Sequence, residues 1–397
     1  MEPNFIPINM NESIEIKSTL SQNITSEWVR DHLMEAIYLN GEMSALEIPP
    51  FRQLKAKLKP FSLPEANPLA ITTNNSNTVD NILSIMLSKS VLRGRKKLIK
   101  PFLQTIKDNM QVLADNEQPL NFVLPTLPFK DQSPFGTGAN IYHTDLGEYC
   151  IFAQLKRILE AIKSIYAPGA HMTLLCDGYI YADIFTNGNK DGAGQYKAKC
   201  EELKNRYGLY NDVTLLDMRE VFFNVPHWEH IEKTIQEKIW ELYHSNEEVK
   251  QRVDFLARRF VFYTALSKLS YEEARVMYMH SPWPHWVWET LLNSAVKYAS
   301  IHLTMKKTNL IANAFPYAIR CTVHPKAAAQ LALHMTNAKN DLLPYNGVAV
   351  VSRQAVNEGL SLYQALRIRR LCDVLRYEDV HAVYTTTAKD PFYYEVA

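Results

Sequence analysis

From residue 120 onward, short apolar runs rich in β-branched residues alternate with longer amphipathic segments. The apolar runs cover 121–127, 172–178, 212–218, 317–323 and 347–352. Between the first two runs, Glu148 to Tyr166 places apolar residues three or four positions apart, which is typical of an amphipathic helix. Strands separated by helices form βαβ units with right-handed crossovers. The alternation therefore predicts an α/β fold with a mostly parallel sheet flanked by helices.

The residues before this alternation predict a separate N-terminal part. Residues 1–25 are polar and aperiodic, which indicates an arm, and Ser26 to Leu39 predicts a helix capped by the serine. Residues 46–78 contain five prolines, a composition that favours a loop. We therefore expect an N-terminal arm and helical lobe over 1–78 and the main domain over 79–397.

Two further stretches predict helices. Asn81 to Met110 has helical character and holds six Lys or Arg residues between Lys89 and Lys100. Such a run is usually a solvated helix face, with a polyanion-contacting patch as the alternative. The stretch from about residue 227 to residue 306 shows helical periodicity and many charges. This pattern predicts a mainly helical insertion in the main domain.

Charge and cysteine content weigh against several classes of protein. There are 43 Lys and Arg residues against 42 Asp and Glu, a net charge of +1, so no overall field recruits nucleic acid or an anionic membrane. No apolar window is long enough to span a bilayer, and the N-terminus lacks the pattern of a signal peptide. We therefore expect a cytoplasmic protein. The five cysteines are far apart and never form a CxxC pair, which favours reduced thiols over disulfides or zinc.

In open α/β sheets, ligands bind beyond the carboxyl ends of the strands. Three such ends carry reactive side chains. The first is the loop with Lys130, the second is CDGYIYAD (176–183), and the third is IRCTVHPK (319–326). In the third segment, Arg320, Thr322 and His324 are two residues apart and so share one strand face, with Lys326 following.

Each candidate has an alternative interpretation. Lys130 is either an exposed lysine, a contact to a phosphate or carboxylate, or an amine that forms an imine. Asp177 precedes a glycine and is as suited to stabilising a turn as to acid–base chemistry. Arg320 and His324 favour a functional role, because burying both on an apolar strand costs desolvation energy unless an anion meets them.

Two familiar ligand motifs are rejected. Gly136-Thr137-Gly138 lacks the third glycine of a nicotinamide or flavin fingerprint. His143 and Asp145 have the spacing of an iron-binding pair, but Asp145 and Glu148 also fit the N-cap and N3 positions of the predicted helix. The histidines around 227–230 and 280–285 supply no third ligand at a familiar spacing, so no metal site is predicted.

Five segments, taken together and in order, resemble the isocyanide (isonitrile) synthases of the pyoverdine/dityrosine biosynthesis family. They are LPTLPFKDQSP, TDLGE, CDGYIYAD, FPYAIRCTVHPK and LLPYNGVAVV, and the resemblance spans about residues 80–355. It implies a modified Rossmann-like core and a metal-independent carbon–carbon lyase without a cofactor. Such an enzyme converts the α-amine of L-tyrosine or L-tryptophan into an isocyanide, with the carbon taken from C2 of ribulose 5-phosphate. The amine condenses with the sugar ketone, phosphate is lost and a carbon–carbon bond breaks. An iron/2-oxoglutarate-dependent oxygenase is the implied pathway partner.

These substrates set demands that the strand-end residues fit. Both are anionic, and Lys130, Arg320 and Lys326 are placed to hold a phosphate or carboxylate. His324, Asp177 and Asp183 are available to move protons, with Asp177 orienting the amine or acting as base. Tyr179 and Tyr181 are expected to form one wall of an aromatic slot.

Two other functions remain as alternatives. The first is a Rossmann-like transferase or nucleotide-binding enzyme of another kind, since many chemistries share this strand–helix alternation. The second is a non-catalytic protein that binds RNA through the basic run at 89–100, whose affinity would depend steeply on salt.

Overall fold

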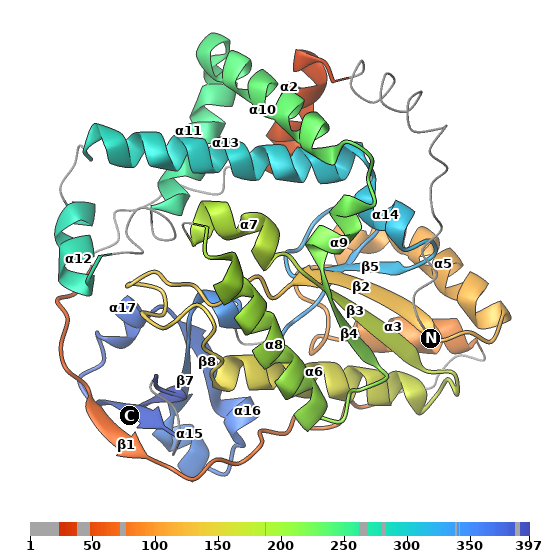
Figure 1. Ribbon diagram of the computed structural model, residues 1–397. Helices are drawn as coiled ribbons and strands as arrows, with labels where there is room; N and C mark the ends of the chain where they lie inside the picture. Colours follow the sequence, from red (N-terminus) through yellow and green to blue (C-terminus); the bar gives the residue numbers. More distant parts are fainter. Residues whose placement is uncertain are drawn as a thin grey trace. The chain divides into compact units, whose positions relative to one another are not determined.

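The computed structural model describes residues 24–37, 48–71, 77–186, 188–261, 269–279, 283–337, 340, 342–385 and 390–397 (Figure 1). The chain divides into two compact units. The helical unit comprises Met1–Ile48, Ile180–Asn189 and Met218–Pro316, and the sheet unit comprises Pro49–Tyr179, Lys190–Asp217 and Tyr317–Ala397. The predicted boundary at residues 78–79 separates two parts that would fold independently. The division into compact units does not test independent folding, so this boundary stays a prediction.

The first sheet of the sheet unit is parallel and confirms the predicted α/β fold. Its strand order is β4-β3-β2-β5-β6, and every neighbouring pair runs parallel. The strands are β2 (Leu120–Thr126), β3 (Ala170–Cys176), β4 (Val213–Asp217), β5 (Ile319–Thr322) and β6 (Leu331–Ala332). Four of the five predicted apolar runs form strands of this sheet.

Helix α6 (Leu146–Lys163) connects β2 to β3 and confirms the helix predicted between them. It contacts β3 of the parallel sheet and β7 (Val348–Ser352) of a second sheet. Fifteen of its eighteen residues are buried, which explains why its apolar stripe is so wide. The connection from β3 to β4 includes α7 (Gly178–Phe185) and α8 (Lys190–Arg206).

The stretch Asn81–Met110 is largely helical, as predicted, but it is not one continuous helix. The chain instead forms α3 (Thr78–Met86), α4 (Lys96–Ile99), the short 3-10 helix η1 (Lys100–Phe102) and α5 (Leu103–Asp115). The interruption has a tertiary cause: Leu92 forms a β-bridge with Leu333, and the N–H of Arg93 donates to the carbonyl of Ala332. Pairing with the sheet thus takes these residues out of helical geometry, and only part of the basic run is helical.

The second sheet is mixed, with strand order β1-β9-β10-β7-β8. Its members are β1 (Lys55–Leu58), β7, β8 (Leu366–Arg369), β9 (Val380–Tyr384) and β10 (Tyr393–Val396). The run at 347–352 is therefore a strand as predicted, but it belongs to this sheet. The described residues of 46–78 form a loop as expected, apart from Thr78, which begins α3, and the four residues of β1. β1 pairs in parallel with β9, more than three hundred residues later. Short helices α15 (Arg353–Asn357), α16 (Leu362–Ala365), α17 (Leu371–Val374) and η2 (Pro344–Asn346) accompany this sheet.

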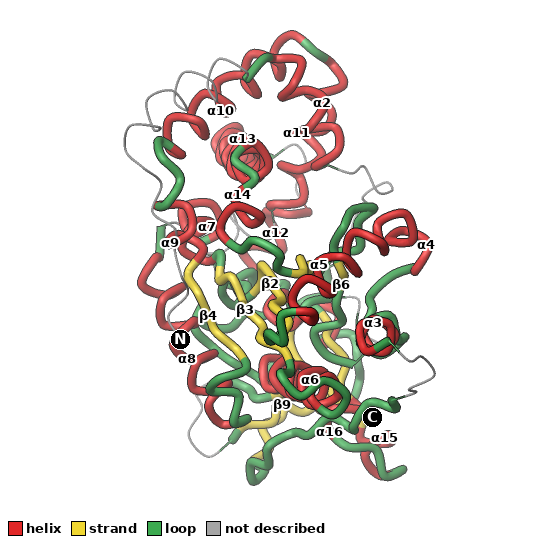
Figure 2. The backbone as a smooth tube through the Cα atoms, turned by 90° about the vertical axis from the view of Figure 1, so that its right-hand side faces the viewer, coloured by secondary structure: helices red, strands yellow, loops and turns green. Residues whose placement is uncertain are grey.

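The helical unit confirms the predicted helical insertion. It contains α9 (Met218–Phe223), α10 (Trp228–Ser245), α11 (Glu247–Phe260), α12 (Tyr271–Met279), α13 (His285–Lys307) and α14 (Leu310–Ala314). Helix α2 (Ser26–Ala36) packs on α10, α11 and α13, and the described part of this unit is helix and loop in Figure 2. The cap of α2 is Thr25, whose hydroxyl accepts from the N–H of Trp28, and not Ser26 as predicted. The predicted residues 38–39 and the arm up to residue 23 lie outside the described residues.

Candidate active site

The carboxyl ends of β2, β3 and β4 lie at one edge of the parallel sheet, because these neighbouring strands run in the same direction. Gly178, the second residue after β3, lies directly against the loop that follows β2. A Cβ atom at this position would collide with the carbonyl oxygen of Pro128, so only glycine allows this approach. The contact holds the loop that carries Lys130 against the end of the strand that precedes Asp177.

Lys130 lies within a buried group of side chains that we call the lysine cluster: Lys130, Asp145, Glu148 and Tyr196. The Nζ atom of Lys130 is 2.9 Å from Oδ2 of Asp145 and donates to Oε1 of Glu148 at 3.0 Å. It also donates to the carbonyl of Pro344 at 2.9 Å, and the Tyr196 hydroxyl donates to Glu148 at 3.0 Å. The side chains of Lys130 and Glu148 are 0% exposed. The ammonium charge is therefore compensated inside the protein.

The two carboxylates of this cluster also cap α6. Asp145 accepts from the N–H of Gly147 at 2.7 Å, and Glu148 accepts from the N–H of Asp145 at 2.9 Å. This arrangement is the capping box predicted from the sequence, which is confirmed. The same two residues thus fix the start of α6 and hold Lys130.

Burial and charge act in opposite directions within the lysine cluster. Burial disfavours the charged form of Lys130, but the attraction of Asp145 and Glu148 raises its pKa above the ordinary value. Burial raises the pKa of Glu148 to about 7, although Lys130 acts to lower it. One ammonium balances one carboxylate, so the second carboxylate in this dry site favours binding a proton. Burial and the neighbouring carboxylate therefore favour the protonated form of Glu148 more than water would.

Asp131, the residue after Lys130, shapes the loop that follows β2. Its Oδ1 atom accepts from the N–H of Ser133 at 2.8 Å, and a Cβ atom at position 136 would collide with its carboxylate. Gly136 is thus explained by this turn. Burial raises the pKa of Asp131 to about 7, although the Ser133 N–H and the charge of Arg370 act to lower it.

Asp177 follows the last residue of β3 and has a buried carboxylate oxygen. Among the described residues, no donor forms a hydrogen bond to its Oδ1 atom. Asp217, the last residue of β4, is opposite Cys176 in the register. Burial is the main cause that raises the pKa of Asp177 to about 7, and the negative charge of Asp217 adds to it. A carboxyl group in this state accepts or donates a proton near neutral pH.

Strand β5 carries the predicted cationic face. Arg320 is exposed and Thr322 is half-buried, while the residues that alternate with them are buried, as the period-two pattern predicts. β5 ends at Thr322, so His324 and Lys326 lie beyond the strand, and both are exposed. The backbone N–H of His324 donates to the Thr322 hydroxyl at 3.2 Å.

The structure brings some of the predicted residues to one edge of the parallel sheet and not others. Lys130, Asp177 and His324 each follow the carboxyl end of a strand. Arg320 instead lies within β5, opposite Val123, which is three residues before the end of β2. The joint role of these residues in one site stays a prediction.

The aromatic and acidic residues of segment 176–183 are divided between the two units. In the sheet unit, the Nζ atom of Lys190 lies 5.0 Å from the ring centre of Tyr179. In the helical unit, Tyr181 is buried, and its hydroxyl is 3.4 Å from Nε2 of His302. Asp183 also belongs to the helical unit and is exposed. The predicted aromatic wall stays a prediction.

Metal binding, thiol pairing and membrane insertion are three properties on which the described residues bear. Within the described ranges, no group of three or more His, Cys, Asp or Glu side chains is placed to hold a metal ion. All five cysteines are free and buried in the structure. In the part of the chain that the structure describes, no helix combines the length and apolar character needed to cross a bilayer. His280 of the predicted histidine pairs lies outside that part.

Sequence reasoning missed several residues of this edge. The sequence assigns Asp145 and Glu148 to the helix cap alone, and it gives neither Asp131, beside Lys130, nor Asp217 a role. The available signal was position, because Asp217 ends a strand and Asp131 follows Lys130. Nothing local in the sequence indicates that Tyr196, forty-eight residues after Glu148, reaches its carboxylate.

A mostly parallel sheet flanked by helices, with buried carboxyl groups at its carboxyl edge, defines a Rossmann-like α/β protein. The family model described as "Pyoverdine/dityrosine biosynthesis protein" matches residues 110–358, more than half of the chain. The chain belongs to this family, as the sequence resemblance predicts.

Named relatives and a solved structure agree with this assignment. The L-tyrosine isonitrile synthase of Pseudomonas aeruginosa is 28% identical over 244 residues, which cover 59% of this chain and 70% of that protein. That of Xenorhabdus nematophila is 22% identical over 247 residues, covering 60% and 70%. An L-tryptophan isonitrile synthase of Fischerella ambigua is 22% identical over 228 residues, covering 57% and 68%. The crystal structure of the PvcA protein from Pseudomonas aeruginosa has a TM-score of 0.59 at 19% identity, covers 81% of this chain and 100% of that one, and supports the fold.

Proposed function

We propose that this protein is an isonitrile synthase that converts the α-amine of L-tyrosine or L-tryptophan into an isocyanide, with ribulose 5-phosphate as the carbon donor. The observation that carries the proposal is membership of the pyoverdine/dityrosine biosynthesis family, whose similar relatives are named as synthases for these two amino acids. The enzyme is of the carbon–carbon lyase type and uses neither a metal ion nor a cofactor. An iron/2-oxoglutarate-dependent oxygenase is the proposed pathway partner.

Asp177 is the proposed base. The ammonium group of the amino acid must lose a proton before its nitrogen attacks the ketone carbon of the sugar. The new C–N bond forms, the ketone oxygen takes a proton to become a hydroxyl, and a further proton releases it as water to leave an imine. A carboxyl group with a pKa of about 7 accepts the first proton and returns it to the leaving oxygen at neutral pH. Loss of phosphate from C5 and cleavage of both carbon–carbon bonds of C2, to C1 and to C3, then leave C2 on the nitrogen as the isocyanide carbon.

The remaining candidates supply binding and proton transfer in this proposal. Arg320 and Lys326 bind an anionic group of a substrate, and His324 transfers protons. For Lys130, the sequence leaves two functional roles open, an anion contact and a transient imine. Either role requires its Nζ atom to leave the carboxylates of Asp145 and Glu148, and an imine also requires loss of a proton that both carboxylates favour. The cluster instead supports a positioning role, in which Lys130 holds the loop after β2.

The amino-acid side chain needs an apolar slot, for which Tyr179 and Tyr181 are the proposed wall. Asp183 is the proposed contact to the amine. Tyr179 belongs to the sheet unit, and Tyr181 and Asp183 belong to the helical unit.

The direct test is a reaction of purified protein with L-tyrosine or L-tryptophan and ribulose 5-phosphate labelled with ¹³C at C2. Mass spectrometry should detect an isocyanide that carries the label, and the amino acid that reacts identifies the substrate. If neither amino acid gives a labelled isocyanide, the proposal is wrong. A thermal-shift comparison addresses the alternative of a nucleotide-binding enzyme, which nucleotides would stabilise and ribulose 5-phosphate would not.

Two further experiments separate the roles of the cations. Borohydride reduction with labelled ribulose 5-phosphate traps any imine, and a label bound to Lys130 would replace the positioning role with covalent catalysis. Replacing Arg320 by Ala should raise KM or abolish turnover while leaving the melting temperature unchanged. Unchanged kinetics of R320A would remove Arg320 from the site.

A further inference from the structure

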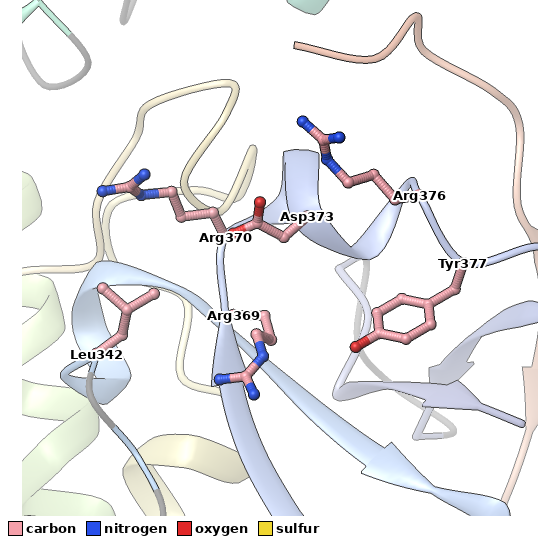
Figure 3. A pocket seen from close by; sticks show the side chains of 6 residues that line it. All are labelled: Leu342, Arg369, Arg370, Asp373, Arg376 and Tyr377. Carbon is pink, nitrogen blue, oxygen red and sulfur yellow. The ribbon is translucent and has the colours of Figure 1, made fainter. Parts of the chain in front are cut away.

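The sheet unit contains a second polar feature, which we call the arginine pocket. It has a volume of about 640 Å³ and is lined by Leu342, Arg369, Arg370, Asp373, Arg376 and Tyr377 (Figure 3). Its size lies within the range of small-molecule sites, roughly 300–1,000 Å³. The arginines and Asp373 follow residue 358, where the family match ends.

The lining of the arginine pocket is rich in positive charge. Of the six described residues that line it, three are arginines and one, Asp373, is acidic. Within the described residues, the side chain of Arg369 donates to the carbonyl of Ile368 at 3.1 Å and forms no ion pair. Arg367 is two residues before Arg369, so it lies on the same face of β8, and burial and the charge of Arg369 lower its pKa. This concentration of like charge favours the binding of an anion.

The pocket is rigidly joined to the loop that follows β2. The N–H of Leu371 donates to the carbonyl of Gly136 at 2.7 Å, and the N–H of Cys372 donates to that of Phe135 at 3.1 Å. Arg370 is also near Asp131, since its charge acts on the carboxyl group of Asp131. The arginine pocket therefore adjoins the segment that leads from the parallel sheet to the lysine cluster.

We propose that the arginine pocket binds a phosphate monoester and, in the reaction proposed above, holds the phosphate of the sugar co-substrate. Guanidinium groups match phosphate oxygens with two parallel hydrogen bonds each, and three of the residues that line the pocket carry such a group.

The charge distribution also discriminates between the two substrates. An amino acid carries an ammonium group beside its carboxylate, and three arginines repel that ammonium. A sugar phosphate carries no positive charge, and the Tyr377 hydroxyl and Asp373 carboxylate are suited to hydrogen bonds with sugar hydroxyls. Arg320 and Lys326 are then the groups left for the amino-acid carboxylate. The identity of the sugar rests on the proposed function, whereas the phosphate site does not.

The test measures binding by isothermal titration calorimetry to the full-length protein, with ribulose 5-phosphate, inorganic phosphate, unphosphorylated ribulose and L-tyrosine. The variants are R369A, R376A and the double variant, with R369K as the conservative replacement. R95A is the matched control, because Arg95 is an exposed arginine in the basic run at 89–100. Circular dichroism melts establish that each variant is folded, and the exposed position of Arg376 makes R376A suitable if R369A does not fold.

We expect R369A and R376A each to raise the Kd for ribulose 5-phosphate at least tenfold and the double variant at least a hundredfold. R369K should lie between R369A and the wild type, and R95A should match the wild type. The Kd for L-tyrosine should change less than twofold, and ribulose without phosphate should bind at least tenfold more weakly than ribulose 5-phosphate. Inorganic phosphate should compete with ribulose 5-phosphate in the wild type.

The outcomes separate this inference from the proposed function. Wild-type binding of ribulose 5-phosphate by the folded double variant would overturn the arginine pocket as the phosphate site, even if the wild type makes isocyanide. Conversely, the wild type could make no isocyanide while the double variant loses the phosphate binding of the wild type. That result would refute the proposed reaction and retain the phosphate site. If the proposed reaction and the phosphate site are both correct, the KM for ribulose 5-phosphate should rise tenfold in R369A. The KM for the amino acid should stay within twofold of the wild-type value.

Discussion

The two sheets of the sheet unit are built from different kinds of sequence information. The parallel sheet uses strands between residues 120 and 332, joined by helices in the repeating order of βαβ units. The mixed sheet joins β1, near the start of the chain, to four strands after residue 347. A local, repeated pattern specifies the first, whereas pairing between distant segments specifies the second.

The two sheets also differ in the charge that they carry. The carboxyl edge of the parallel sheet holds buried carboxyl groups, and burial raises the pKa of Asp131, Glu148 and Asp177 to about 7. The mixed sheet holds the arginine pocket and Glu395, a buried carboxylate with two lysine partners. This difference underlies the proposed division between proton transfer at the parallel sheet and anion binding at the mixed sheet.

Replacement of Asp177 by Asn is expected to give the largest effect. The amide has nearly the same shape but cannot accept the proton of the amine, so kcat should fall by about 10² to 10⁴. The melting temperature should stay the same or rise, because Asn removes a buried charge without a partner. Steady-state rates of isocyanide formation measure the first effect, and a thermal melt measures the second.

Asp191 provides the matched control for this variant, because it is an exposed aspartate at the start of α8. D191N should keep the wild-type kcat within twofold. If D177N keeps the wild-type rate, Asp177 is not the base, and proton transfer has to be sought elsewhere along the edge.

Replacement of Lys130 by Met is expected to affect stability more than any other change at the lysine cluster. It leaves Asp145 and Glu148 buried without their cation, so the free energy of unfolding should fall by about 3–5 kcal/mol. Urea denaturation at pH 7 measures this loss. The result tests whether the lysine cluster stabilises the packing of α6 against the loop after β2.

Lys156 provides the comparison on α6 itself, because it pairs with Glu160 at 3.9 Å on the exposed surface. K156M should change the free energy of unfolding by less than about 0.5 kcal/mol. Equal stabilities of K130M and K156M would mean that the lysine cluster contributes no more than a surface ion pair.

The contrast between local patterns and the pairing of distant segments explains how much of the fold the sequence predicts. The five apolar runs and the insertion at 227–306 have strong local periodicity, and all of them appear as strands or helices in the structure. β1 is four residues long with mostly exposed side chains, so it has no apolar pattern of its own. It is a strand because β9 offers it backbone hydrogen bonds, which residues 46–78 alone do not indicate.

The candidate site follows a similar rule. Residues just after strand ends, such as Lys130, Asp177 and His324, were identified from position and residue type. Their partners were not, because the hydrogen bond from Tyr196 to Glu148 and the carbonyl of Pro344 depend on how α8 and η2 pack. The arginines at 369, 370 and 376 were overlooked because no predicted element ended there.

The pH dependence of stability should distinguish wild type from D177N. The folded-state pKa of Asp177, about 7, is above its ordinary value, so the folded protein keeps a proton that the unfolded chain loses near pH 4. The stabilising effect of that proton is complete at low pH and is lost as the pH rises to about 7. Relative to D177N, the wild type should therefore lose up to about 1 kcal/mol of unfolding free energy per pH unit between pH 5 and 7.

Urea denaturation of the wild type and D177N at several pH values measures this difference in unfolding free energy. The similar contributions of Asp131 and Glu148 cancel, because both proteins contain these residues. A constant difference between pH 5 and 7 would show that Asp177 has an ordinary pKa and is no general base near neutrality. The kcat of the wild type should also rise with pH through the same interval, as the base loses its proton.

Replacement of Glu395 by Gln in the mixed sheet should give the smallest effect, with the opposite pH dependence. Burial acts to raise the pKa of Glu395, but hydrogen bonds from Lys57, at 2.8 Å, and from Lys59 lower it below the ordinary value. Its contribution to stability is therefore present above about pH 4.5 and is lost as the pH falls through the lowered pKa. E395Q should lose about 1 kcal/mol at pH 7, because both lysines are partly exposed and water screens their charge.

This loss should shrink below pH 4, whereas the exposed-site variant E378Q should match the wild type at every pH. A deficit of E395Q that is as large at pH 3.5 as at pH 7 would mean that packing, and not charge, holds β10 to β1. The opposite slopes expected for Asp177 and Glu395 have one physical origin. A buried carboxyl group without a cation favours the protonated form, and one with two lysines favours the ionised form, so only the former is available to exchange a proton during a reaction near neutral pH.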